Sequence, residues 1–232
     1  MKIYGAGTLE EIKKCTNLGV AGILTNPQYY EQYFQGKMTL EEITKAILEV
    51  TDLPIFMQIH GRTTEELLEK AKNLHRISPQ VGFKIISDEK GFFAIRELQK
   101  EGIKCIATTL FSLSQAAMSA CVGAFGICPF IARARDIGLD SFRILKTIKE
   151  GYDNLEKAPE IIAVSLRSVG DIELAISAGV DAVGMRYPLI KKMMEHPLSI
   201  NAEELFVKNW ATVKGEDISY LAHALELRGE GE

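Results

Sequence analysis

Short apolar segments alternate with longer helical patterns along the whole chain, and this alternation restricts the possible folds more than any other feature. Strict strand–helix alternation favours a parallel sheet, and eight repeats favour a closed α/β barrel, the (β/α)8 TIM barrel, over an open sheet. An open, doubly wound sheet also lacks support because no GxGxxG motif follows a strand. The expected strands are Lys2–Tyr4, Val20–Leu24, Ile55–Ile59, Gly82–Ile86, Lys104–Ala107, Phe125–Cys128, Ile161–Val164 and Ala182–Gly184.

The stretches between these strands carry helix signals. "TLEEI" and "TTEELL" place a threonine before an acidic first turn, as helix starts do. The chain of 232 residues is 47% hydrophobic, which suffices for one large core, and no linker divides it. Residues 1–232 are therefore expected to form a single barrel domain. The expected helices are Thr8–Leu18, Thr39–Val50, Thr63–Ile77, Glu89–Glu101, Ser112–Val122, Ser141–Leu155 and Val169–Ala178.

One further helix, Asn201–Gly215, is expected beyond the eight repeats. Leu205, Phe206 and Trp210 give it an apolar stripe that the eight helices of the barrel do not need. Two uses stay open for this extra C-terminal helix: it covers one end of the barrel, or it packs on a neighbouring subunit.

Composition limits the partners and the compartment. The net charge is −4 and no long basic run is present, so neither nucleic acid nor an anionic membrane is an expected partner. No apolar run reaches the about 18 residues of a membrane span, and the first residues lack the apolar core of a signal peptide. The four cysteines show no CxxC spacing. We expect a soluble protein of the cytoplasm.

Lys84 is a lone lysine among Val81, Phe83, Ile85 and Ile86. An isolated ammonium group is costly to bury, and burial lowers the pKa of a lysine. A lysine with a lowered pKa carries a free amine, which attacks carbonyl carbons. The alternative is that Lys84 lies near the strand end and extends its charge to water.

In a TIM barrel the functional groups gather at the carboxyl ends of the strands. Gln58 and His60 are two residues apart near the end of the third strand, and therefore on one face if the strand continues. No clustered carboxylates and imidazoles suggest a metal site, and no GxSxG motif suggests a serine nucleophile. An amine with neutral hydrogen-bonding groups fits Schiff-base chemistry, for which neither a metal nor another cofactor is expected.

Several arginines also follow these strands. Arg133, Ser165 and Arg167 come after the sixth and seventh strands, where many barrels bind phosphate, and they suit an anionic group of the substrate. Arg135 and Arg186 fit a surface ion pair equally well.

Five ordered motifs resemble the transaldolase family, most closely its short-chain branch, which includes fructose-6-phosphate aldolase. The motifs are "LTNP", the lysine of the fourth strand, "TTLFSLSQA", "PFIARARD" and "AVSLRS". The resemblance implies that Lys84 forms an imine with a dihydroxyacetone-type donor, and that Thr108 and Gln58 serve the catalytic water. It also implies an oligomer, a pentamer or a decamer, joined through the last helix. The substrate-binding residues implied are Thr25, Asn26, Phe130, Arg133, Ser165 and Arg167.

The chain departs from the family at the first strand. Ala6 occupies the position of an aspartate that acts as acid or base in family members. Gln58 is the choice of the aldolases, whereas Phe130 is that of ordinary transaldolases. Because imidazoles titrate near neutral pH, we hypothesise that His60 moves the proton together with the water at Gln58 and Thr108.

The expected function is that of a Schiff-base transaldolase or aldolase of carbohydrate metabolism, as in the pentose phosphate pathway. Its substrate would be a phosphorylated ketose such as fructose 6-phosphate. The alternative is a catalytically impaired, transaldolase-like protein that binds a sugar phosphate, and the missing aspartate favours it. A purely structural ring-forming protein is disfavoured because Lys84 is retained.

Overall fold

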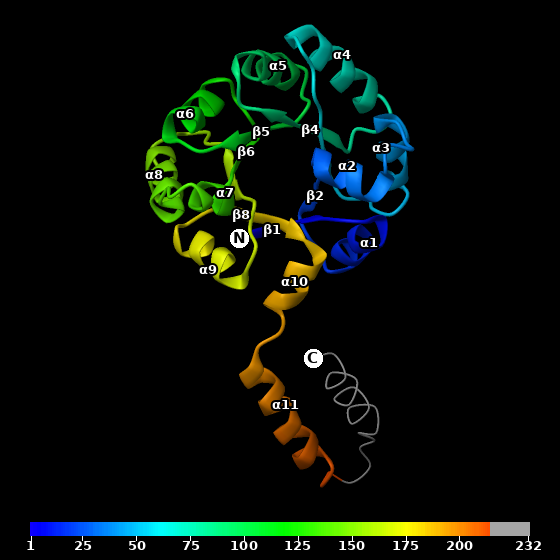
Figure 1. The fold of residues 1–232 in the computed structure, drawn as a ribbon, viewed down its shortest axis with the longest axis vertical. Coiled ribbons are helices and arrows are strands. Elements are labelled where there is room, and N and C mark those ends of the chain that lie inside the picture. Colours follow the sequence, from blue (N-terminus) through cyan, green and yellow to red (C-terminus); the bar gives the residue numbers. More distant parts are fainter. Residues whose placement is uncertain (214–232) are drawn as a thin grey trace. The chain divides into compact units, whose positions relative to one another are not determined.

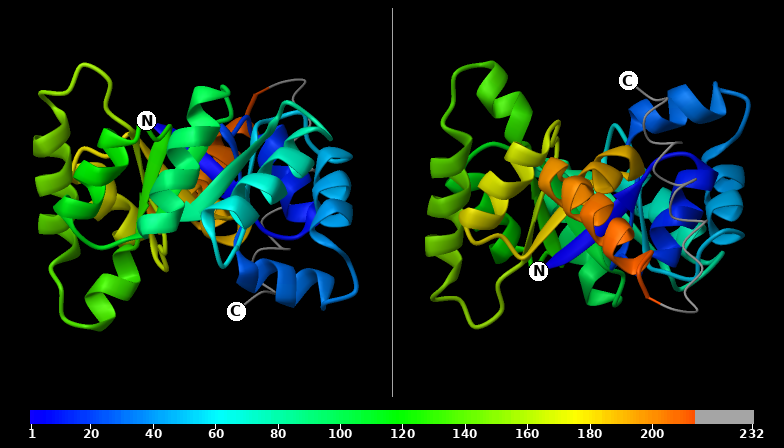
Figure 2. Two further views of the ribbon diagram at one scale, coloured as in Figure 1. Left: turned by 90° about the horizontal axis from the view of Figure 1, so that it is seen from above. Right: turned by 90° about the horizontal axis from the view of Figure 1, so that it is seen from below.

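The computed structural model describes residues 1–213, and it contains a closed barrel of eight parallel strands in the order β1 to β8. This confirms the expected (β/α)8 fold. Figure 1 shows the ring of strands with helices around it, and both views of Figure 2 show helices on either flank of the strands. The strands are β1 (Lys2–Ala6), β2 (Gly22–Leu24), β3 (Ile55–Gln58), β4 (Val81–Ile86), β5 (Cys105–Leu110), β6 (Gly126–Pro129), β7 (Glu160–Ala163) and β8 (Ala182–Arg186).

The helices between the strands begin at side-chain caps, as the sequence signals indicate. Thr8 and Thr39 each form a capping box with the glutamate three residues later, which satisfies free backbone N–H groups at the helix start. The seven expected helices are present as α1 (Leu9–Asn17), α3 (Leu40–Leu48), α4 (Thr64–His75), α5 (Glu89–Lys100), α6 (Leu113–Cys121), α8 (Ser141–Tyr152) and α9 (Val169–Ser177).

Three short helices were not expected from the sequence. They are α2 (Pro27–Phe34), α7 (Ile131–Asp136) and α10 (Tyr187–Met193), and they follow directly on β2, β6 and β8. The start of α2 follows the rule that asparagine caps a helix and proline takes its first position, because Asn26 and Pro27 do this here. These helices matter because they place further side chains beside the carboxyl ends of the strands.

The barrel interior is filled by large and small residues in alternation around the ring. A Cβ atom on Gly82 would lie 3.0 Å from the ring of Phe56, so glycine makes room for the aromatic side chain. The large residues of this layer are Tyr4, Phe56, Ile106 and Ile162, and their neighbours in register are Gly22, Gly82, Gly126 and Ala182. The packed layer closes the barrel below its carboxyl end.

The chain divides into two compact units, and the second begins at Ile190. It contains α11 (Pro197–Trp210), which starts earlier than the expected helix at 201–215; residues 214 and 215 of that expectation lie outside the described residues. Leu205, Phe206 and Trp210 are exposed in the single chain, so the expected contact with a neighbouring subunit remains a prediction. Among the helices that the structure describes, none is long and apolar enough to span a membrane.

Candidate active site

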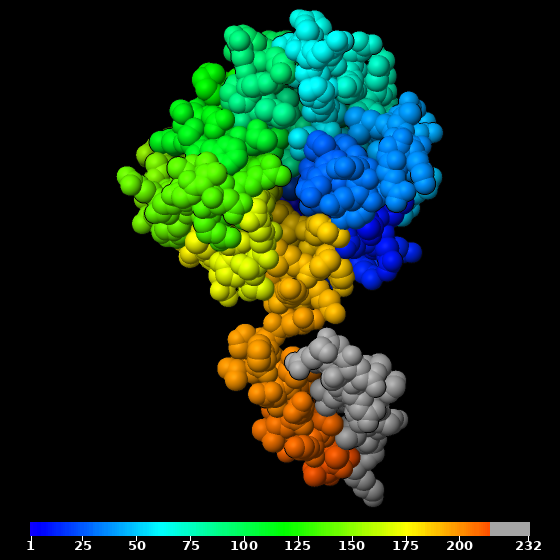
Figure 3. All heavy atoms as spheres, in the orientation of Figure 1, coloured from blue at the N-terminus to red at the C-terminus, as the bar shows by residue number. Residues whose placement is uncertain are grey.

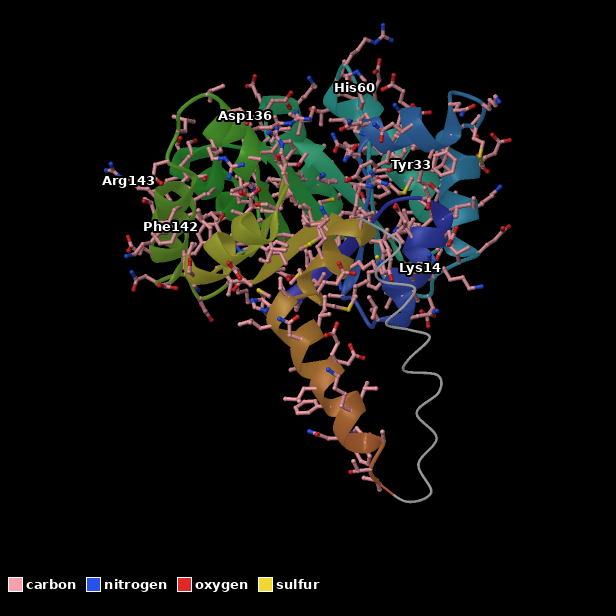
Figure 4. All side chains as sticks on the ribbon, turned by 60° about the horizontal axis from the view of Figure 1, so that its bottom comes forward. Lys14, Tyr33, His60, Asp136, Phe142 and Arg143 are labelled. Carbon is pink, nitrogen blue, oxygen red and sulfur yellow. The ribbon has the colours of Figure 1, made fainter. Side chains whose placement is uncertain are left out.

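The carboxyl ends of the strands carry most of the residues that the sequence analysis selected. Of these residues, His60 follows β3, and Figure 4 shows it in the upper part of the barrel together with Tyr33 and Asp136, which follow β2 and β6. Figure 3 shows α2, coloured blue, on the barrel face in view. The candidate site therefore lies at the carboxyl end of the barrel.

Lys84 lies on the inner face of β4, and only 4% of the residue is exposed. Its Nζ atom lies 3.4 Å from the carbonyl oxygen of Thr25, and no carboxylate within residues 1–213 forms an ion pair with it. Burial lowers the pKa of Lys84; the nearby Cys128 thiol opposes this shift and the charge of Arg133 adds to it. The buried amine thus favours the reactive interpretation over extension to water.

Phe130 connects the amine to an arginine. The Nζ atom of Lys84 lies 5.9 Å from the centroid of the Phe130 ring, and Cζ of Arg133 lies 5.3 Å from it. Phe111 meets the same ring edge-on. Phe130 directly precedes α7, so this short helix positions Arg133 beside the amine.

Thr25 and Asn26 hold the end of β2 in place. The Thr25 hydroxyl lies 2.5 Å from the Tyr30 hydroxyl and accepts a hydrogen bond from the backbone N–H of Gln58, so it joins β2, α2 and β3. Its carbonyl oxygen is the atom that meets Lys84. The Asn26 side chain accepts from the backbone N–H of Tyr29 and thereby starts α2.

Gln58 and Thr108 lie on the two strands next to β4, one on either side. Gln58 pairs with Lys84 in the β3–β4 register, whereas Thr108 of β5 pairs with Ile86, two residues beyond Lys84, and with Cys128 of β6. Thr108 is fully buried, yet its hydroxyl has no hydrogen-bond partner in the part of the chain that the structure describes. A buried hydroxyl without a partner is unusual and suits a place where a water or a substrate oxygen binds.

His60 is exposed and lies beyond β3, which ends at Gln58. The alternation of inner and outer faces therefore does not extend to His60. Its backbone oxygen accepts a hydrogen bond from Lys70, and among the described residues its side chain makes no hydrogen bond. The structure thus does not bring the imidazole into contact with Lys84, Gln58 or Thr108.

The predicted anion site contains two different kinds of arginine. Arg167 donates two hydrogen bonds to Asp136, of 2.8 and 2.6 Å, whereas Arg133 forms no ion pair within the described chain. Ser165 adopts a φ of 60°, and its backbone oxygen accepts from the N–H of Ala132 at the start of α7. Arg133 is therefore the arginine of this set with the most free donors.

The two arginines for which a surface ion pair was an equally good interpretation of the sequence both form ion pairs. Arg135 pairs with the buried Asp171, and Arg186 pairs with Glu11. Burial alone would raise the pKa of Asp171, but hydrogen bonds from Arg135 and from the backbone N–H of Arg167 outweigh it and lower that pKa.

Sequence reasoning missed the aromatic residues of α2. Tyr29, Tyr30 and Tyr33 all follow the Asn–Pro helix start, and Tyr30 bonds to Thr25 and to the backbone oxygen of Gln58. The signal was present, because "NPQYYEQY" places three tyrosines within two turns after a strand end.

The sequence of this chain is similar to one family of known proteins over nearly its whole length. A family described as Transaldolase/Fructose-6-phosphate aldolase matches residues 6–229. "Probable transaldolase 2" of Listeria monocytogenes is 35% identical over 212 residues, which cover 90% of this chain and 96% of that protein. "Probable transaldolase" of Streptococcus equi is 34% identical over 216 residues, which cover 92% of this chain and 100% of that protein.

Solved structures with low sequence identity share only the fold. A thiamine phosphate pyrophosphorylase from Pyrococcus furiosus matches 80% of this chain and 85% of its own, with a TM-score of 0.56 and 15% identity. A flavocytochrome b2 variant matches 81% of this chain, which spans 57% of the flavocytochrome, with a TM-score of 0.59 and 15% identity. The family match and the two bacterial relatives agree on a more specific conclusion: this chain belongs to the transaldolase/fructose-6-phosphate aldolase family.

Proposed function

We propose that this protein is a Schiff-base transaldolase or aldolase that acts on the dihydroxyacetone unit of a phosphorylated ketose such as fructose 6-phosphate. The observation that carries the proposal is the buried amine of Lys84, whose pKa is lowered by burial and which has no acidic partner in the described residues. Such an amine is unprotonated, and therefore nucleophilic, at a lower pH than an ordinary lysine.

The reaction begins when Nζ of Lys84 attacks the carbonyl carbon C2 of the ketose. Loss of water from the adduct leaves a protonated imine. The C4 hydroxyl then loses its proton, the C3–C4 bond breaks, and its electron pair passes to the imine to form an enamine while an aldehyde departs. The enamine carbon attacks an acceptor aldehyde or takes a proton, and water then hydrolyses the imine to free the amine.

The other residues position the two halves of the substrate. Asn26, next to the Thr25 carbonyl that meets Lys84, binds donor hydroxyls. Arg133, with Ser165 and Arg167, binds the phosphate of the other half through charge-assisted hydrogen bonds. The unpartnered hydroxyl of Thr108 holds the water that takes part in imine formation and hydrolysis.

The proton at the C4 hydroxyl needs a carrier, because Ala6 offers no ionisable group on the inner face of β1. The proposed carrier is the water at Thr108 and Gln58. His60, at the rim of the barrel, is proposed to pass the proton between this water and the solvent. General acid–base transfer of this kind contributes about 10²–10⁴-fold to a rate.

The absence of an ionisable group at Ala6 also favours a second function. A family member without an acid at the first strand would bind a sugar phosphate and form little product. Catalytically impaired binding is therefore the alternative.

The test is reduction with borohydride in the presence of dihydroxyacetone or fructose 6-phosphate, followed by intact mass measurement. A mass gain of one reduced three-carbon unit that is absent from Lys84→Met supports the proposed enzyme. Binding of fructose 6-phosphate without any adduct would support the alternative. The same sample would show by light scattering whether the protein is the proposed pentamer or decamer.

A further inference from the structure

Four side chains gather where β1 and β8 end, and they are here named the rim cluster: Glu11, Tyr29, Tyr33 and Arg186. Arg186 is the last residue of β8 and pairs in register with Ala6 of β1. It falls on the inner face, because a Cβ atom on Gly184, two residues earlier, would meet side chains of the barrel interior. The guanidinium group therefore stands beside a methyl group that carries no charge.

The rim cluster holds more hydrogen-bond donors than acceptors. Arg186 Nε and the Tyr33 hydroxyl are both buried, and neither has a partner among residues 1–213. The carboxylate of Glu11 is already occupied, because it accepts from the backbone N–H of Thr8 at 2.9 Å and from Nη2 of Arg186 at 3.0 and 3.3 Å. Two buried donors in one cluster, without an acceptor among the described residues, suit a place where a bound group supplies one.

A purely structural ion pair would not explain this arrangement. Arg186 uses the single nitrogen Nη2 for both oxygens of Glu11, and the side chain remains 39% exposed. Cζ of Arg186 lies 5.2 Å from the centroid of the Tyr33 ring, so the ring supports one face of the guanidinium group. Glu11 and Tyr33 therefore hold Arg186 in place and leave Nε and Nη1 for another group.

The rim cluster lies on the side of Lys84 where Asn26 is proposed to bind the hydroxyls of the dihydroxyacetone unit. The Thr25 carbonyl meets Lys84, Asn26 follows it, and the rings of Tyr29 and Tyr33 on α2 stack 5.8 Å apart. Tyr33, labelled in Figure 4, then reaches Arg186. In the closed ring β8 stands opposite β4, whereas Arg133 approaches Lys84 from the β6 side through Phe130.

We propose that the rim cluster binds an oxyanion group on the donor half of the substrate, with Arg186 and Tyr33 as its ligands. The shared chemistry is a phosphate or a carboxylate near the carbonyl that Lys84 attacks. Besides the unsubstituted dihydroxyacetone unit of fructose 6-phosphate, the site would therefore also take a ketose phosphorylated at C1, or a 2-oxo acid. This inference rests on the proposed imine chemistry and adds a substrate class to it.

Arginine and tyrosine together suit such a group. A guanidinium group forms charge-assisted hydrogen bonds to carboxylate and phosphate oxygens, and these are stronger than bonds to a neutral hydroxyl. The tyrosine hydroxyl adds a neutral donor. Ala6, next in register, presents no carboxylate that would repel the anion.

The experiment compares three carbonyl compounds: dihydroxyacetone phosphate, pyruvate and dihydroxyacetone. Borohydride trapping and intact mass give the half-saturating concentration of each for the wild type, Arg186→Gln, Tyr33→Phe and Arg133→Gln. The readout is the preference ratio, the half-saturating concentration of dihydroxyacetone divided by that of an anionic compound. Arg133→Gln is the matched comparison, since it removes the same charge near the same amine, but at the site proposed for the phosphate of the other half of the substrate.

We expect the wild type to prefer at least one anionic compound, and the compound preferred distinguishes phosphate from carboxylate. Arg186→Gln should lower the preference ratio about tenfold or more and Tyr33→Phe severalfold, whereas Arg133→Gln should lower it less than Arg186→Gln does. The inference is overturned if the wild type shows no preference, if Arg186→Gln leaves the ratio unchanged, or if Arg133→Gln lowers it more.

The failure of imine formation is a separate outcome. If none of the three compounds is trapped, the proposed enzyme is wrong. Calorimetry with glycerol 3-phosphate and lactate, which lack a ketone group and cannot form an imine, still decides the inference. Weaker binding of either compound to Arg186→Gln than to Arg133→Gln supports the rim cluster. Equal binding to all variants refutes it.

Discussion

The amine of Lys84 on β4 meets the carbonyl oxygen of Thr25 at the end of β2, with 3.4 Å between nitrogen and oxygen. This contact joins the reactive group to the segment that starts α2, since Asn26 follows Thr25 and caps that helix. The backbone oxygen is a neutral acceptor, so it orients the amine and provides no full negative charge that would hold a proton on it. The contact explains how one site holds the lysine in place while burial keeps its pKa lowered.

The first prediction concerns the pH dependence of stability. The pKa of Lys84 in the fold is lower than the ordinary value of 10.5, so between these two values the unfolded chain binds more protons than the folded chain. The contribution of Lys84 to the free energy of unfolding should therefore increase as pH rises through that window and decrease as pH falls through it. Denaturant titrations of the wild type and Lys84→Met should show this pH-dependent difference. Parallel curves would mean that the amine is not desolvated.

The second prediction separates the two arginines of the anion site. Replacing Arg133 or Arg167 with alanine should raise KM for fructose 6-phosphate about tenfold or more, since each charged hydrogen bond is worth about 1.5–3 kcal/mol. Arg133→Ala should have the larger effect, because Arg167 already donates to Asp136. Fructose is the control substrate. Equal changes for fructose and its phosphate would assign both arginines to structure alone.

The third prediction uses the unpartnered hydroxyl of Thr108. Thr108→Val keeps the shape of the side chain and removes a buried hydroxyl that lacks a partner, so the free energy of unfolding should rise by about 1 kcal/mol or stay unchanged. The turnover number should fall about tenfold or more, because the water that serves the imine loses its ligand. A destabilised variant would show instead that the hydroxyl supports the fold.

The fourth prediction tests the glycine layer of the barrel. A Cβ atom on Gly82 would lie 2.6 Å from the carbonyl oxygen of Lys104 and 3.0 Å from the Phe56 ring. Gly82→Ala should therefore lower the free energy of unfolding by about 1–3 kcal/mol, measured with denaturant. Gly170→Ala is the control, since its nearest atom would be 3.7 Å away and alanine favours helices. Equal losses in both variants would contradict the packing argument.

The barrel was predictable from sequence because its cause is local. Each strand is a short apolar run, each helix has its own start signal, and eight repetitions leave few other topologies. Lys84 was predictable for the same reason, since a single lysine among apolar residues can be recognised within the six residues of β4. The strand ends differ from those expected by at most three residues.

The ion pairs and the rim cluster were not predictable, because they depend on distant segments. Asp136 stands 31 positions before Arg167, and only the short helix α7 after β6 brings them together. Glu11 and Arg186 lie 175 positions apart and meet because β1 and β8 close the barrel. His60 does not share a strand face with Gln58 because β3 ends at Gln58. Strand ends are poorly encoded in sequence.

The last prediction addresses the acid missing from the first strand. Ala6 is 3% exposed on the inner face of β1, where a carboxylate would point into the barrel but would also stand beside Arg186. Ala6→Asp should raise turnover of fructose 6-phosphate, because it supplies a group that takes the proton of the C4 hydroxyl. It should also weaken trapping of dihydroxyacetone phosphate, since two negative charges would then share the β1–β8 rim.

His60→Ala completes this test of proton transfer. If His60 carries the proton, the turnover number should fall about 10²-fold with borohydride trapping retained, and Ala6→Asp should restore part of the loss. His75→Ala serves as the control, because His75 bonds to the backbone oxygen of Val81 near the start of β4, at the opposite end of the strand from the site. An unchanged turnover number in His60→Ala would remove the imidazole from the mechanism and leave proton transfer to the water at Thr108 and Gln58. That result would agree with the exposure of His60, and Ala6→Asp would then be the variant that measures how much rate the missing acid supplies.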